Sequence, residues 1–203
     1  MSSPDSALVM KFIAAYAGNY TKGRYRYGKI TGITLHHMAA NMLIEALGRL
    51  WQTVGRYGSS HYGVQLKNIA QYVNEADIAW TNGNWAANCT NVTIEVANSG
   101  GSPNWEIADD TIETLIQLVA DIAERNDLYP LVVGTSLNWH SMYAATLCPG
   151  PYMMSMLSHI AQKANQIIFD KSKKPETTPT PARLGLYEYI ITLLQAFEKP
   201  VFV

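Results

Sequence analysis

Apolar positions recur at helical spacing in three stretches of the chain. Between Asp109 and Asn126 they repeat every three or four residues, the spacing that places them on one face of a helix. Asn41 to Val54 and Met153 to Phe169 carry similar stripes. Because a one-sided helix must bury its apolar face, this pattern predicts three helices packed against a common core.

Short apolar runs bounded by turn-forming residues predict strands between these helices. Lys29 to His37 predicts a central strand that ends on two histidines. His61 to Leu66 and Ile69 to Val73, joined by a tight turn, predict a hairpin. Further strands are predicted at Val92–Ala97 and Leu131–Val133. Strands that alternate with helices predict an α/β fold, a central mixed β-sheet flanked by helices.

Other stretches lack a regular pattern. Trp80 to Asn91 and His140 to Pro151 are predicted to be loops. The folded domain is expected to span residues 1–170, followed by a Pro/Thr-rich linker at 171–183 that favours extended chain. The tail, 184–203, carries a helical stripe but is too short for its own core. We expect it to dock, to mediate oligomerisation, or to begin a truncated further segment.

Composition narrows the classes of partner. The 203 residues are 48% apolar and 15% charged, with a formal net charge of -1, so nothing predicts the basic face that a nucleic-acid binder needs. No run approaches the roughly 20 apolar residues of a membrane anchor, and no export signal is recognisable. Two cysteines are too few for a disulfide framework. We therefore expect cytoplasmic synthesis without a membrane anchor.

Three side chains have the chemistry of a zinc site. His36 lies at the end of the central strand, and His140 and Cys148 lie on one loop with seven residues between them. Catalytic Zn²⁺ is held by three such imidazole or thiolate ligands, with the fourth position left for water. Pro149 and Pro151 restrict the chain after the cysteine. A His-x7-Cys spacing is weak evidence by itself, but it predicts one metal centre.

Six sequence blocks, read together, carry a more specific signal. They are Ile33–Ala39, Ser59–Tyr62, Ile69–Val73, Ala79–Trp80 with Gly83, Val92–Val96, and His140 to Cys148-Pro149-Gly150. In these blocks the chain resembles the zinc-dependent N-acetylmuramoyl-L-alanine amidases of phage endolysins, bacterial autolysins and animal peptidoglycan-recognition proteins. The resemblance covers about Asn19 to Asn165 and implies a curved mixed sheet, with zinc at the floor of a groove for peptidoglycan.

The resemblance also implies roles for residues around the metal. Glu95 matches the carboxylate that serves as general acid/base in related amidases. Thr146 stands two residues before Cys148, where some relatives have a lysine that stabilises the oxyanion, and a hydroxyl is a weaker donor. His37, His61 and Trp80 are candidate substrate contacts. His61 could equally be a structural imidazole, and Trp80 could pack on the core.

Two alternative functions remain open at this stage. Cys148 could be a nucleophile activated by His140, as in cysteine peptidoglycan hydrolases. The chain could also be a non-catalytic peptidoglycan-binding module, although such modules lose a zinc ligand and all three are present here. The endolysin interpretation, with release to the bacterial cell wall, is favoured by the linker, which would tether a wall-binding segment. An intracellular recycling amidase would share the same site.

Overall fold

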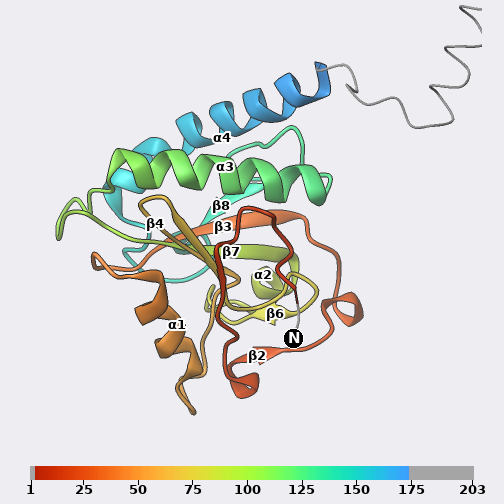
Figure 1. Ribbon diagram of the computed structural model, residues 1–203, viewed down its shortest axis with the longest axis vertical. Coiled ribbons are helices and arrows are strands. Elements are labelled where there is room, and N and C mark those ends of the chain that lie inside the picture. The colour runs from red at the N-terminus through yellow and green to blue at the C-terminus, as the bar shows by residue number, and fades with distance from the viewer. Residues whose placement is uncertain (1–2, 174–203) are drawn as a thin grey trace, which may run out of the picture. The chain divides into compact units, whose positions relative to one another are not determined.

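The computed structural model describes residues 3–173, which form a mixed β-sheet with helices on both faces (Figure 1). The six-stranded sheet has the order β1-β5-β4-β7-β3-β8. Its strands are β1 (Lys11–Phe12), β3 (Gly32–His37), β4 (Tyr62–Gln65), β5 (Asn68–Gln71), β7 (Asn91–Val96) and β8 (Leu137–Trp139). The predicted fold class, a mixed sheet flanked by helices, is confirmed.

Strand directions explain where the sheet can carry a site. The hairpin β4–β5 is antiparallel, as predicted, whereas β3 is parallel to both β7 and β8, and β7 is parallel to β4. These four strands therefore run in the same direction, and their carboxyl ends lie together at one edge of the sheet. A second, small sheet pairs β2 (Tyr20–Thr21) with β6 (Ile78–Ala79). Such edges, where loops leave parallel strands, are common places for functional residues.

Register decides which side chains share a face. Ile33 and Leu35 of β3 are aligned with Val92 and Ile94 of β7, and all four are fully buried in the larger core. Because side chains alternate along a strand, His36 projects to the opposite face. Its partner in the register is Glu95. The pairing that builds the core thus also places an imidazole beside a carboxylate.

Two long helices cover the apolar face of the sheet (Figure 1). They are α3 (Asp109–Arg125) and α4 (Gly150–Lys173), of which the part up to Ile168 belongs to the compact unit 1–168. Leu115, Leu118 and Ile122 of α3 are completely buried. Each such side chain contributes about 1.5–3 kcal/mol through burial. This layer fixes the sheet and leaves the other face for chemistry.

The opposite face is covered less completely by two shorter helices, α1 (Ile44–Gln52) and α2 (Trp85–Thr90). Helix α1 packs its apolar side on a smaller core that includes Trp51 and Tyr72. Three short 3-10 helices complete the described part: η1 (Ala17–Asn19), η2 (Arg24–Arg26) and η3 (His140–Met142). No helix within residues 3–173 is both long and apolar enough to span a bilayer.

The predicted strand at Leu131–Val133 is wrong. The Leu131 backbone bonds to the side chain of Asn165 on α4, and the Val132 carbonyl accepts the backbone N–H groups of a turn. The edge strand is instead β8, Leu137–Trp139, which pairs with β3. A three-residue strand has no pattern of its own, so its partner decides where it forms.

Other boundaries also differ from the prediction. The predicted loop at Trp80–Asn91 contains helix α2, whose first turn is capped by the side chain of Asn84. Helix α4 begins at Gly150, inside the second predicted loop, and includes 171–173, which were predicted as linker. The rest of that linker and the tail at 184–203 lie outside the described residues.

Candidate metal centre

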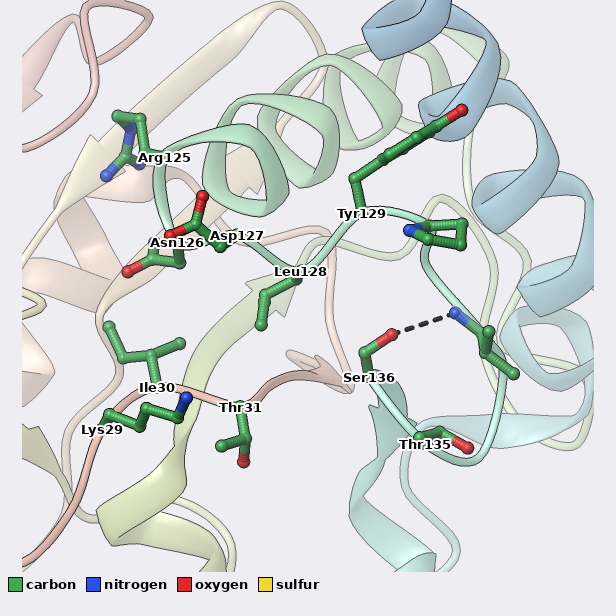
Figure 2. A pocket seen from close by; sticks show the side chains of 12 residues that line it. Lys29, Ile30, Thr31, Arg125, Asn126, Asp127, Leu128, Tyr129, Thr135 and Ser136 are labelled. Atoms are coloured by element: carbon green, nitrogen blue, oxygen red, sulfur yellow. Dashed lines mark hydrogen bonds between the residues drawn. The ribbon is translucent and has the colours of Figure 1, made fainter.

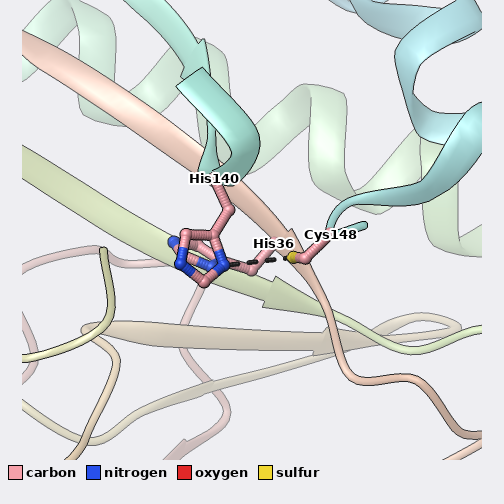
Figure 3. A group of neighbouring side chains, drawn as sticks. All are labelled: His36, His140 and Cys148. Carbon is pink, nitrogen blue, oxygen red and sulfur yellow. Dashed lines mark hydrogen bonds between the residues drawn. The ribbon is translucent and has the colours of Figure 1, made fainter. Parts of the chain in front are cut away.

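Two parts of the chain that are far apart in sequence bring His36 together with His140 and Cys148 (Figure 3). His36 lies in β3, and His140 directly follows the parallel neighbour β8, so the two imidazoles emerge at the same edge. Cys148 lies on the loop that leads into α4. The candidate ligand atoms all lie within 4.8 Å of one another.

The dimensions of this cluster fit a tetrahedral ion. Zinc bonds of about 2.1 Å to nitrogen and about 2.3 Å to sulfur, at a tetrahedral angle, place the two ligand atoms about 3.6 Å apart. Nδ1 of His36 lies 3.8 Å from Sγ of Cys148. Two imidazoles and one thiol are also the donor set that zinc prefers over magnesium or calcium. The residues present therefore fit a zinc ion with a fourth position open.

Burial keeps the imidazoles neutral, the state that a metal requires. Burial and the neighbouring His140 together lower the pKa of His36 to about 3, and a hydrogen bond with Asn82 opposes this shift. The pKa values of His140 and His37 are also lowered, mainly by burial. Because protons do not compete for these nitrogens near neutral pH, the site is ready to bind a cation.

The thiol of Cys148 is in the opposite situation. Burial raises its pKa to about 12, and the nearby charge of Glu95 adds to the rise. The backbone N–H of His37, whose nitrogen lies 3.4 Å from Sγ, opposes this shift. The thiol therefore keeps its proton unless a cation displaces it.

Glu95 is the carboxylate of the site. It is 9% exposed, and burial raises its pKa to about 8, while the positive charge of Arg56 opposes the rise. A carboxyl group with a pKa near neutrality exchanges protons readily at physiological pH. Glu95 is aligned with His36 in the register. It is the only carboxylate among the described residues that line the same cavity.

These side chains open into one cavity of about 560 Å³. The three candidate ligands, Glu95, Thr146, His37 and Trp80 all line it. A second cavity of about 570 Å³ lies where the chain enters β3, between Lys29–Thr31 and the segment after α3 (Figure 2). No histidine or cysteine lines that second cavity. The chemistry expected from the sequence is therefore gathered at the first.

The remaining candidates in the cavity have defined contacts. The Thr146 hydroxyl oxygen accepts the backbone N–H of Cys148 at 3.2 Å, which leaves its own proton free to be donated. Nδ1 of His37 lies 3.2 Å from Asn98 Oδ1, and its ring meets Trp105 edge-on. The Trp80 indole donates to Thr21 at 3.0 Å. These contacts hold each side chain at the cavity wall.

The expectation that His61 contacts substrate is corrected. His61 is completely buried and does not line the cavity. Its Nε2 lies 2.7 Å from a guanidinium nitrogen of Arg24, and its Nδ1 lies 3.0 Å from the Thr93 hydroxyl. The backbone N–H of Thr93 also donates to Nδ1 at 3.0 Å, and Nε2 lies 3.2 Å from the carbonyl oxygen of Asp77, so both ring nitrogens are engaged within the protein. His61 is thus a structural imidazole beneath the site.

Two residues near the metal were missed in the sequence. Asn82 lies within hydrogen-bond distance of His36, with 3.0 Å between Oδ1 and Nε2. Arg56 is the only lysine or arginine among the described residues that line the cavity, and it lies over the Trp51 ring at 5.6 Å. Both lie in irregular segments without periodicity, so only their polar character could have drawn attention to them.

The mixed sheet thus carries two imidazoles, a thiol and a buried carboxylate in one cavity. The chain belongs to the N-acetylmuramoyl-L-alanine amidase family, whose model matches residues 26–151. This is a family of peptidoglycan amidases, and the match contains all three candidate ligands and Glu95. No curated protein matches the chain.

Solved structures share the fold at low sequence identity. The Staphylococcus aureus hydrolase AmiA, solved with its ligand, has a TM-score of 0.66 and 16% identity, over 87% of this chain and 98% of that one. A mutant endolysin from Bacillus subtilis gives 0.61 and 16%, over 77% and 99%. PlyL gives 0.58 and 18%, over 77% and 96%. The predicted recognition of the family is therefore confirmed.

Proposed function

We propose that this protein is a zinc-dependent hydrolase that cleaves the amide between N-acetylmuramic acid and L-alanine in peptidoglycan. The observation that carries the proposal is the convergence of His36, His140 and Cys148 within 4.8 Å, in a cavity that Glu95 also lines. When bound by these three side chains, zinc supplies a Lewis acid that polarises the scissile carbonyl and activates water. The family of the chain supplies the substrate class.

Glu95 performs the proton transfers in this proposal. Its carboxylate oxygen takes a proton from the attacking water and gives it to the nitrogen of the leaving L-alanine, which must be protonated to depart. Burial favours this role because it holds the pKa of Glu95 at about 8, between that of an ordinary carboxyl group and that of an amine. The same carboxyl group can then act as base first and acid afterwards.

Thr146, His37 and Trp80 orient the substrate in this proposal. The Thr146 hydroxyl donates a hydrogen bond to the oxygen of the scissile carbonyl as negative charge develops there. The imidazole of His37 and the indole of Trp80 lie on the cavity wall, where they would contact the stem peptide and the sugar. These roles depend on the groups that face the cavity and not on the metal alone.

A cysteine nucleophile is disfavoured. Cys148 lies two residues before the start of α4, a position that could lower a thiol pKa, yet burial and Glu95 raise it to about 12. A nucleophilic cysteine needs the reverse, a thiolate at neutral pH. This environment suits a ligand that loses its proton only to a cation.

The decisive experiment incubates the purified protein with cell walls and measures newly freed L-alanine amino groups, with and without a chelator. We expect release that the chelator abolishes and added zinc restores. Release that continues after metal removal would support the cysteine mechanism, and no release from zinc-loaded protein would support a binding module. Lysis of walls would agree with the proposed endolysin role.

A further inference from the structure

Asn82 interacts with both candidate histidine ligands, although it lies outside the strands that position them. It is completely buried in the segment between β6 and α2. Its side-chain Oδ1 lies 3.0 Å from Nε2 of His36, and an interaction of its backbone with the ring of His140 opposes the lowering of the His140 pKa. One residue therefore contacts two of the three side chains that would hold the ion.

The contact with His36 decides which nitrogen of that ring is available. The amide oxygen of Asn82 only accepts hydrogen bonds, so Nε2 of a neutral His36 must carry the proton. The other nitrogen, Nδ1, is then bare, and this is the atom that lies 3.8 Å from Cys148 Sγ. Asn82 thereby selects the tautomer in which the unprotonated nitrogen points at the metal position.

The contact with His140 uses the backbone of the same residue. The N–H of Asn82 is already donated to Asn88 Oδ1, with 2.9 Å between the atoms, so the carbonyl is the group left to accept from the imidazole. Such outer hydrogen bonds set the orientation of a ligating ring and raise its basicity. One short segment thus contacts both imidazoles.

This segment is itself held in place. The Asn88 side chain on α2 accepts the backbone N–H groups of Thr81 and Asn82. Gly83 has φ +61°, a left-handed conformation that a side chain would strain. The Asn84 side chain then caps α2. Asn82 consequently has little freedom to move when a metal binds or leaves.

The Asn82 amide has a cost that stability alone does not explain. Its Nδ2 is buried and finds no hydrogen-bond partner among the residues 3–173. A buried donor left unpaired costs about 1–3 kcal/mol. A small apolar residue would avoid that cost, so the contact of Oδ1 with His36 is what an asparagine adds here.

We propose that Asn82 is a positioning residue of the metal centre, whose side-chain oxygen orients His36 for one zinc ion. This inference rests on the proposed function only in taking zinc as the ion. It predicts an effect on metal affinity that is separate from any effect on folding.

The test measures the zinc dissociation constant by competition with a coloured chelator. We expect Asn82→Ala to weaken binding about 10–100-fold. Asn82→Asp, which keeps the acceptor and adds negative charge, should bind zinc at least as tightly as the wild type. The matched control is Asn165→Ala, which removes two hydrogen bonds to Leu131 far from the ligands and should leave zinc affinity unchanged.

Two further readouts separate positioning from folding. The melting temperature of the metal-free Asn82→Ala variant should stay close to that of the wild type, because the unpaired donor is removed as well. The visible absorption of the cobalt-substituted variant should shift, since the His36 ring is no longer held by Oδ1. Unchanged zinc affinity in a folded Asn82→Ala variant, or equal weakening by Asn82→Asp, would overturn the inference. A wild-type chain that takes up no zinc would instead overturn the proposed function.

Discussion

At the scale of single residues, the site combines groups that folding alone would not favour. Glu95 is a buried carboxylate whose pKa is raised to about 8, and Cys148 is a half-buried thiol whose pKa is raised to about 12. Each ionises only at a cost in the metal-free protein. A bound cation stabilises both charged forms, so metal binding releases the Cys148 proton and metal affinity should rise with pH.

Substitution of Glu95 separates catalysis from stability. We expect Glu95→Gln to lower the rate of amide hydrolysis about 10²–10⁴-fold, because the proton carrier is lost. The folded pKa of Glu95 is raised, so its neutral form stabilises the fold below the unfolded pKa, 4.5, and this stability is lost as pH rises through about 8. Glutamine never ionises, so the metal-free variant should melt higher than the wild type above that pH.

Melting curves with chelator at acidic and alkaline pH, together with the wall assay, measure both effects. Glu113→Gln, on the exposed side of α3, is the control and should change neither activity nor melting temperature. A Glu95→Gln variant that keeps wild-type activity would remove Glu95 from the mechanism.

Substitution of the two cysteines distinguishes the ligand from a bystander. Cys148→Ser replaces a soft thiolate by a hydroxyl, so bound zinc, counted by elemental analysis, should fall well below one ion per chain. Cys89 is buried on α2 and belongs to no candidate metal group among the described residues. Cys89→Ser should therefore retain full zinc content, and equal loss in both variants would contradict the assignment.

At the scale of elements, one arginine ties helix α2 to the rest of the fold. Arg24 of η2 is 3% exposed and donates to the backbone carbonyls of Glu75, Asn88, Cys89 and Asn91. Two of these carbonyls belong to the last turn of α2, where a cation is favourable. Because α2 holds the segment that contains Asn82, this buried guanidinium indirectly stabilises the metal centre.

Removal of that guanidinium should be costly. We expect Arg24→Met to destabilise the protein by about 3 kcal/mol, since several buried carbonyls and the His61 ring lose their donor. Urea unfolding measures the change. Arg26→Met, in the same 3-10 helix but exposed and in contact with Tyr25, is the matched control and should differ from the wild type by less than about 0.5 kcal/mol. A similar effect of both substitutions would refute the role of Arg24.

At the scale of the whole molecule, the metal centre joins distant parts of the chain. His36 and Cys148 are separated by 112 positions, and an ion between them would connect the central strand to the loop that leads into α4. A ligand that binds only the folded state stabilises it by mass action. The centre should therefore contribute to stability as well as to chemistry.

Zinc should accordingly raise the melting temperature in proportion to the logarithm of its concentration. At a free concentration 100 times the dissociation constant, the stabilisation is about 2.7 kcal/mol. Differential scanning calorimetry across a zinc series measures it, with Cys148→Ser as the comparison that should show little dependence. No dependence in the wild type would mean that the cluster does not bind the ion.

The proposed domain organisation can be tested by truncation. Within residues 3–173 the last buried apolar side chain is Ile168, so a chain that ends at Lys173 should fold and should hydrolyse soluble muramyl peptides at the full-length rate. If residues 184–203 mediate wall binding or oligomerisation, the shortened chain should bind walls more weakly or elute as a smaller species. Loss of folding in the shortened chain would contradict the proposed boundary.

Much of this organisation could be predicted from the sequence because it depends on local patterns. The helical stripe of Asp109–Asn126, the hairpin and the strand that ends at His37 each show the periodic apolar pattern of a helix or a strand. The candidate ligands were recognisable because few side chain types bind zinc. Glu95 was identified by the resemblance to the family, since an isolated glutamate on a strand has no chemical signature of its own.

Only the tertiary structure decided the features that depend on neighbours distant in sequence. The register between β3 and β7 sets Glu95 beside His36, and pairing with β3 determines that the edge strand is Leu137–Trp139. His61 contacts buried Arg24 and not the cavity, and Asn82 contacts the candidate ligand His36. The physical reason is that a side chain's role depends on burial and partners, which long-range packing supplies and local periodicity does not encode.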